Sequence, residues 1–148
     1  MKLLFTALLF LFPFIGFSQA TVNYSLLDSN ENAVLRKNKA LEYELSIRTE
    51  LTSIDRTPAG DLKLVFKKHD PNANSYDYDT YIFDKNDKCH SVSTQVSIGK
   101  LAVFLAQMKE SGYRNNGQNL YYNEKEKIAA KVESNITRKV FTVTYTRK

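Results

Sequence analysis

The clearest pattern of hydrophobic and polar residues lies between residues 78 and 113. Residues 80–83 are β-branched and aromatic, and residues 90–96 alternate between apolar and polar side chains. Both segments are typical of half-buried strands. The five polar residues 84–88 between them favour a turn. The pattern therefore predicts a β-hairpin.

An amphipathic helix is predicted to follow this hairpin. Ser97 is placed to cap its N-terminus, and Gly112 is placed to end it in a left-handed conformation. Between them, apolar residues recur at three- and four-residue spacing and so share one stripe. The stripe consists of Ile98, Leu101, Ala102, Leu105 and Met108, and Phe104 widens it. We expect this stripe to pack on the hairpin as the main core contact.

Further strands are predicted on both sides of this unit. Residues 62–67 and 140–146 alternate cleanly, and residues 119–122 form a shorter apolar segment. Residues 127–133 also alternate and are counted as a strand, with a short helix as the alternative because Ala, Lys and Glu favour it. The turn formers of residues 69–79 predict a polar loop.

The segment 33–54 contains no Gly or Pro, and its pattern is ambiguous. Residues 41–48 alternate as a strand does, whereas Ala40, Tyr43, Ile47, Leu51 and Ile54 fit a helical stripe. The Leu, Glu, Lys and Arg residues of the segment favour a helix. We predict a helix over residues 31–40 and favour its continuation through 41–52, with a strand as the alternative.

These elements predict an α+β fold without an internal repeat. We expect an antiparallel sheet of about five to six strands, because hairpin-type connections join its segments. One main amphipathic helix is expected to pack on one face of the sheet. The N-terminal segment is expected to be helical.

The first 20 residues have the pattern of a secretory signal peptide. Lys2 precedes an apolar run that Pro13 and Gly16 interrupt, and small residues lie at 18–20. The run is too short and too broken for a membrane span, which needs about 20 residues. With its Phe-Ser-Gln-Ala ending, this leader resembles those of exported proteins from Bacteroidetes-type bacteria. We expect an exported protein, periplasmic or extracellular, with a single domain over residues 21–148 and no transmembrane segment in the mature chain.

The charge of the chain argues against nucleic acid as a partner. Removing residues 1–20 leaves 128 of the 148 residues and lowers the formal net charge from +5 to +4, because Lys2 is the only charge lost. A nucleic-acid surface needs Lys and Arg clustered on one face. Here acids and bases interleave along the chain.

The sequence contains no recognisable catalytic, cofactor or metal motif. The segment 70–74 places oxygen ligands as a calcium loop begins, but Ser75 replaces the required Gly and Tyr81 the bidentate Glu. The single cysteine, Cys89, excludes an internal disulfide and is expected to be a buried small hydrophobe. His90 follows it directly, so on a strand the two side chains point to opposite faces. We therefore predict no catalytic residues, no cofactor and no metal.

Nine tyrosines and no tryptophan are the unusual feature of the composition. Tyrosines cover sheet faces with an apolar ring and a hydrated hydroxyl, and an exposed row of them can bind a sugar or a peptide. The candidate surface residues are Tyr76, Tyr78, Tyr81, His69 and His90. We expect a non-enzymatic binding or envelope-associated module whose partner is a protein, a peptide or a glycan. The alternative is a hydrolase with an acidic site that no motif marks.

Overall fold

The computed structural model describes residues 23–45, 47–70 and 75–148. The expected leader and the centre of the calcium-like segment lie outside these residues. The helices are η1 (Asn23–Leu26), α1 (Glu31–Leu45), η2 (Ile98–Lys100) and α2 (Leu101–Glu110). The strands are β1 (Arg48–Arg56), β2 (Leu62–Asp70), β3 (Ser75–Phe83), β4 (Cys89–Ser97), β5 (Arg114–Asn115), β6 (Leu120–Asn123), β7 (Ile128–Asn135) and β8 (Val140–Arg147).

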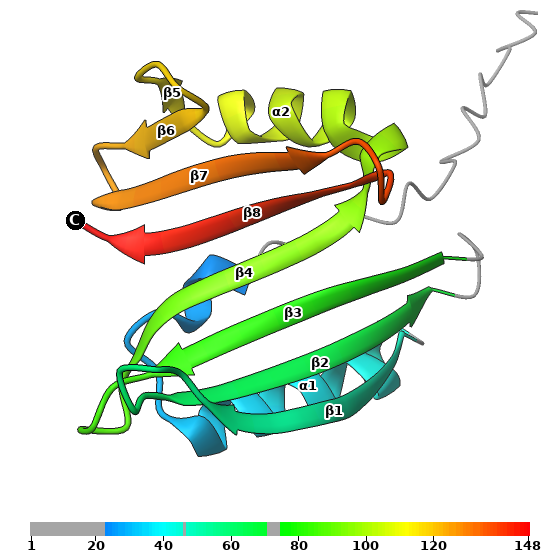
Figure 1. Ribbon diagram of the computed structural model, residues 1–148, viewed down its shortest axis with the longest axis vertical. Coiled ribbons are helices and arrows are strands. Elements are labelled where there is room, and N and C mark those ends of the chain that lie inside the picture. Colours follow the sequence, from blue (N-terminus) through cyan, green and yellow to red (C-terminus); the bar gives the residue numbers. More distant parts are fainter. Residues whose placement is uncertain (1–22, 46, 71–74) are drawn as a thin grey trace, which may run out of the picture.

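All eight strands form one antiparallel sheet in the order β1-β2-β3-β4-β8-β7-β6-β5. The chain thus makes two successive units, each a helix followed by four strands, which join where β4 pairs with β8 (Figure 1). The sequence shows no internal repeat, but in the described chain the order of one α-helix followed by four strands occurs twice. We call these units the first half (23–97) and the second half (98–148).

The predicted fold class is wrong in its proportions. The molecule is mostly sheet, with eight strands instead of five to six and with two α-helices instead of one main helix. The antiparallel pairing itself is confirmed. Two strands account for the difference. Residues 48–56 form β1 rather than a continued helix, and residues 114–115 form the short strand β5 where a loop was expected. Residues 128–135 form β7, in agreement with the alternation of residues 127–133.

The boundary between α1 and β1 lies where the sequence has no Gly or Pro to mark it. The helix predicted over residues 31–40 is present and continues to Leu45. Among the α1 residues whose side chains are described, Val34, Asn38 and Leu41 are buried, at helical spacing. After the helix, the Ile47 amide donates to the Leu41 carbonyl (3.3 Å), and the chain then turns into β1.

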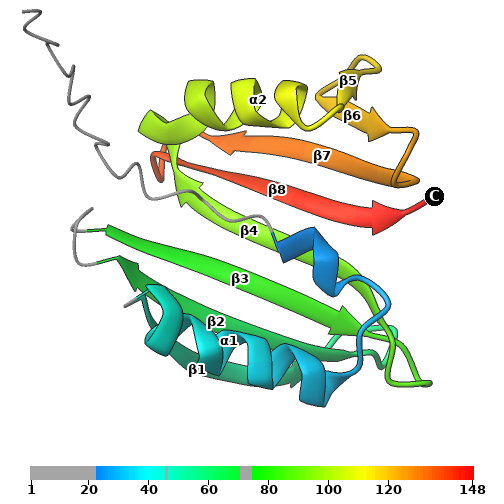
Figure 2. The same cartoon turned by 180° about the vertical axis from the view of Figure 1, so that it is seen from behind.

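The core lies on one face of the sheet, which we call the inner face. Both helices pack there: α1 lies behind β1–β3 in Figure 1 and in front of them in Figure 2. Helix α2 contributes Phe104, whose ring lies 5.3 Å from that of Phe141 on β8. The alternation predicted for β2 and β8 is confirmed, since Leu64, Phe66, Phe141, Val143 and Tyr145 lie at alternate positions and are all buried.

The predicted helix after the hairpin is present, but its two ends behave differently. Ser97 makes no side-chain cap, and the Ile98 amide donates to the Lys139 carbonyl instead (2.9 Å). Gly112 has a φ of +90°, as predicted. The Gly112 amide donates to the Lys109 carbonyl and the Tyr113 amide to the Met108 carbonyl. This pair of bonds is a Schellman motif, which turns the chain directly into the second half of the sheet.

Candidate functional site

The face opposite the core carries the first candidate site. Because side chains alternate along strands, the residues between the core positions of β3, β4 and β8 point to this outer face. Strand register places nine of them in three rows, which we call the central grid. The rows are Tyr78–Gln95–Thr142, Thr80–Ser93–Thr144 and Ile82–Ser91–Thr146.

The central grid is uncharged and rich in hydroxyl groups. Six of its nine side chains belong to Ser or Thr, and none is ionisable except Tyr78. The Ser93 and Thr144 hydroxyls lie 2.9 Å apart and form a hydrogen bond across the two halves. Both helices pack on the inner face, so no helix in the described part of the chain covers the grid.

An exposed aromatic group adjoins the grid at the end of β2 and β3, and we call it the Tyr76 group. The Tyr76 side chain is 54% exposed. Lys67 Nζ lies 3.9 Å from the centre of its ring, and the His69 ring lies 5.0 Å away. The ammonium group over the aromatic ring is a cation–π contact between β2 and β3.

The structure brings three of the five candidate residues together. His69 and Tyr76 are paired across β2 and β3, and Tyr78 follows Tyr76 on the same face. Tyr81 instead lies in the core with no exposed surface, so its selection as a surface residue is wrong. His90 lies at the other end of the β3–β4 hairpin, where Nε2 is 3.1 Å from Asp61 Oδ2.

A buried charge network on the inner face was not predicted. Asp79 has no exposed surface, forms an ion pair with Lys68, and accepts a hydrogen bond from Thr94 (2.8 Å) and from Tyr81 (3.2 Å). The sequence places Asp79 in a polar loop, but β2 and β3 extend to Asp70 and from Ser75. Its partners Lys68 and Thr94 lie on neighbouring strands, so only the strand register brings them together.

Asp77 extends this network towards α2. Lys100 Nζ lies 3.4 Å from Asp77 Oδ2, and the Asp77 side chain is 15% exposed. Burial raises the pKa of the Asp77 carboxyl, and the nearby Lys100 ammonium opposes that shift. Each of the two carboxylates therefore has a lysine partner, an arrangement that joins β2 and β3 to the start of α2.

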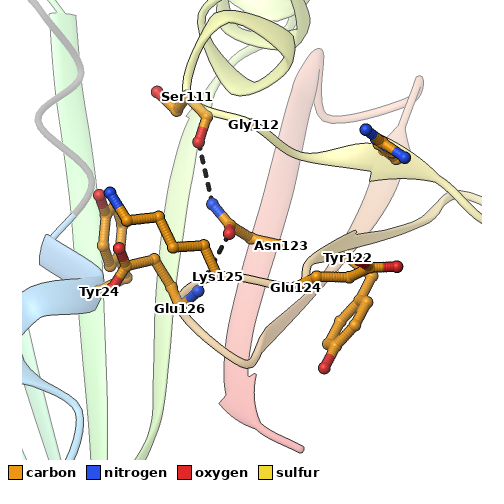
Figure 3. Close-up of a pocket in the computed structure, with 9 residues that line it drawn as sticks. Tyr24, Ser111, Gly112, Tyr122, Asn123, Glu124, Lys125 and Glu126 are labelled. Carbon is orange, nitrogen blue, oxygen red and sulfur yellow. Dashed lines mark hydrogen bonds between the residues drawn. The ribbon is translucent and has the colours of Figure 1, made fainter.

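A hollow of about 350 Å³ lies where α2 ends and the β6–β7 turn begins (Figure 3). Asn123 lies between its two sides: Tyr24, Lys125 and Glu126 are on one side, and Tyr122 and Glu124 on the other. The Asn123 amide donates to the Ser111 carbonyl (2.9 Å), and its oxygen accepts from the Glu126 amide (3.1 Å). Both polar ends of Asn123 are thus used to hold the turn against the helix.

Three tyrosine rings pack beneath this hollow and join η1 to the second half. Tyr24, Tyr113 and Tyr145 have ring centres 6.0–6.3 Å apart. Burial raises the pKa of Tyr113 and of Tyr145 well above the usual value for a phenol. Both hydroxyls therefore stay protonated, and these tyrosines act as core residues.

The single thiol is also part of the core, as predicted. Cys89 has no exposed surface, and its Sγ lies 3.4 Å from the Ser91 carbonyl. Burial raises the pKa of the Cys89 thiol to about 11. A buried, protonated thiol is a poor nucleophile. The adjacent His90 is exposed, and it falls at the irregularity where the pairing of β3 with β4 shifts, so the simple alternation expected of the two side chains does not apply at this point.

Within residues 23–45, 47–70 and 75–148, no group of three or more His, Cys, Asp or Glu side chains is arranged to hold a metal ion. No helix of the described chain is long and apolar enough to cross a membrane. Comparison with protein-family models, with curated proteins and with solved structures finds no match to this chain.

Proposed function

We propose that the protein is a small exported binding module of a bacterial envelope, and that it holds a neutral glycan on the outer face of its sheet. The central grid is the observation that carries this proposal. No helix of the described chain covers it, its side chains carry no charge, and an exposed aromatic group lies next to it. Eight of its nine side chains are half-buried, and Ser91 is buried. The signal-peptide pattern of residues 1–20 supports export.

The chemistry of the grid suits a hydroxyl-rich partner. Ser and Thr hydroxyls both donate and accept hydrogen bonds, so they can match sugar hydroxyls in either role. The rings of Tyr76 and Tyr78 add apolar surface that also carries a phenol group. A neutral sugar chain carries no charge that its binding surface must neutralise. It therefore suits the central grid, which has no charged side chain.

The acidic hydrolase that the sequence left open has less support. The acids that converge on the inner face are Asp77 and Asp79, and both are engaged with lysines. Asp79 is fully buried, so a substrate does not reach it in this conformation. The central grid lies on the outer face, which no helix of the described chain covers. A hydrolase built on Asp77 and Asp79 would need a substrate to reach the inner face, where these carboxylates are paired with lysines.

The test is a titration of the full chain, exported through its own leader, with neutral oligosaccharides such as cello-, xylo- and manno-oligosaccharides. We expect amide NMR shifts to change along β3, β4 and β8. Thr144→Glu should abolish these changes, because it places a carboxylate in the middle row of the grid. Ala102→Glu adds the same side chain at an exposed position of α2 and should leave binding intact.

Two results would argue against the proposal. One is the absence of shift changes with every neutral sugar. The other is a set of changes confined to the helices or to the hollow near Asn123. N-terminal sequencing of the exported protein checks the leader separately, and we expect the mature chain to begin at Thr21.

A further inference from the structure

We infer that two copies of this chain associate through strand β1, in the antiparallel register that places Arg48 of one copy opposite Asp55 of the other. β1 is an edge strand of nine residues. In the part of the chain that the structure describes, nothing pairs with its free edge. The N–H and C=O groups on that edge can pair with another strand.

The free edge has apolar side chains beside it. Leu51 is 37% exposed, and Ile54 is 66% exposed. Their partners on β2 are Phe66 and Leu64, which are inner-face residues, so Leu51 and Ile54 lie on the inner face too. Large apolar side chains at a sheet edge gain stability when a second sheet edge covers them.

An irregularity in β1 makes self-pairing possible in one particular register. The pairing with β2 shifts between Leu51 and Ser53, which marks a β-bulge. Before the bulge, Arg48 and Glu50 point to the outer face; after it, Ser53 and Asp55 do. An antiparallel pairing of Arg48 with Asp55 also aligns Glu50 with Ser53 and Thr49 with Ile54. The four outer residues named above then meet one another in two pairs, the inner residues Thr49 and Ile54 meet each other, and Leu51 falls opposite Thr52 at the bulge.

The charges agree with this register. Arg48 and Asp55 are both exposed, and the two-fold symmetry produces the Arg–Asp pair twice. Asp55 Oδ1 already accepts the Arg56 amide (2.8 Å), which fixes the side chain at the edge and leaves Oδ2 for the arginine of the second copy. Opposite charges directly across a strand pair stabilise it, whereas like charges destabilise it.

The consequence is a continuous sheet of two copies, with both central grids on one side. One strand pair buries a modest area, so we expect a dimer with a micromolar dissociation constant. The edge charges of a strand can instead serve to prevent such pairing. The experiment below decides between the two roles.

The test measures the mass of the full chain by sedimentation velocity over a range of concentrations. We expect a monomer–dimer equilibrium. Arg48→Asp and Asp55→Arg should each weaken dimerisation by about tenfold or more, since each change creates two like-charge contacts. The double variant Arg48→Asp/Asp55→Arg should restore the dimer, because it exchanges the two charges.

The matched control is Arg56→Asp, which makes the same change of charge on the same strand but outside the paired segment, and it should leave dimerisation unchanged. As an independent measurement, hydrogen exchange at Thr49 and Ile54 should slow as the protein concentration rises. A monomer at every concentration overturns the inference. So does a dimer that the single charge reversals leave intact or that the double variant fails to restore.

Discussion

At the scale of single residues, Asp79 is a buried position with several polar partners. It is a carboxylate without exposed surface, and Lys68, Thr94 and Tyr81 surround it. Burying two charges is costly, and their attraction offsets that cost only while both partners are present. The ion pair is therefore a point at which a single substitution does large damage.

We expect Asp79→Asn to lower the free energy of unfolding by about 3 kcal/mol, because it leaves Lys68 buried without its counter-charge. Adding Lys68→Met should recover part of that loss. The control is Asp61→Asn, whose contact with His90 lies at the surface and is worth less than about 1 kcal/mol. Urea denaturation measures all three. If Asp79→Asn and Asp61→Asn lowered the free energy of unfolding equally, the buried ion pair of Asp79 would contribute no more to stability than a surface contact.

The raised pKa of Asp77 makes the stability of the protein depend on pH. Burial raises its pKa above the ordinary 3.8, so the folded protein binds this proton more tightly than the unfolded chain does. The stabilisation from that proton is complete below the unfolded pKa and is lost as the pH rises through the folded pKa. We therefore expect the melting temperature of Asp77→Asn, relative to the wild type, to rise between about pH 3 and pH 7.

Asp84 is the matched control of opposite sign. The Lys88 and Asn86 amides donate hydrogen bonds to its carboxylate, and these bonds lower its pKa. Its stabilisation is present above the unfolded pKa and is lost as the pH falls through the lower folded value. Asp84→Asn should therefore lose stability relative to the wild type as the pH rises. If the stability of Asp77→Asn and of Asp84→Asn, each relative to the wild type, changed with pH in the same direction, the opposite pKa shifts of Asp77 and Asp84 would be contradicted.

At the scale of the elements, α2 shows how a sequence stripe differs from a buried face. The predicted stripe contains Met108, and Phe104 only widens it, but Phe104 and Met108 are the residues of α2 that are buried. Leu101 and Leu105 pack at the margin of the core, and Ala102 is exposed. Spacing of three and four residues identifies the side of the helix to within about one position. The packing partner, here Phe141, decides which position is deepest.

We expect Phe104→Ala to destabilise the protein by about 3–5 kcal/mol, since it leaves a cavity against Phe141. Leu105→Ala should cost clearly less, because Leu105 is half-buried. Val103→Ala is the control, as Val103 is 48% exposed. Thermal unfolding ranks the three variants. If Leu105→Ala lowered the melting temperature more than Phe104→Ala does, Leu105 rather than Phe104 would be the main core residue of α2.

The elements also show which structure the sequence can predict. The strands with strict alternation, such as residues 140–146, were predicted correctly because each side chain agrees with the period of two. β1 was missed because its Glu, Leu and Arg residues favour a helix and no Gly or Pro precedes it. The charge network was missed because an Asp in a polar sequence is typical of a loop. Only the register of β2, β3 and β4 shows that Asp79 is buried.

At the scale of the whole molecule, the two halves join at a single strand pair. Seven residues of β4 are paired with seven of β8. Contacts across the halves reinforce this seam, including the ring contact of Tyr24 with Tyr145 and the ion pair of Asp28 with Arg147 (2.8 Å). The central grid spans the same seam, so the proposed glycan surface exists only while the halves are joined.

The chain crosses from one half to the other once, between Ser97 and Ile98. A break in the backbone at this point leaves two fragments, each with a helix and four strands, and each with one unpaired strand that matches the other. The fold is therefore suited to fragment complementation, in which two separately produced pieces regain the sheet by docking β4 against β8. In that form, the assembly of the binding face would depend on the concentrations of two polypeptides rather than on the folding of one.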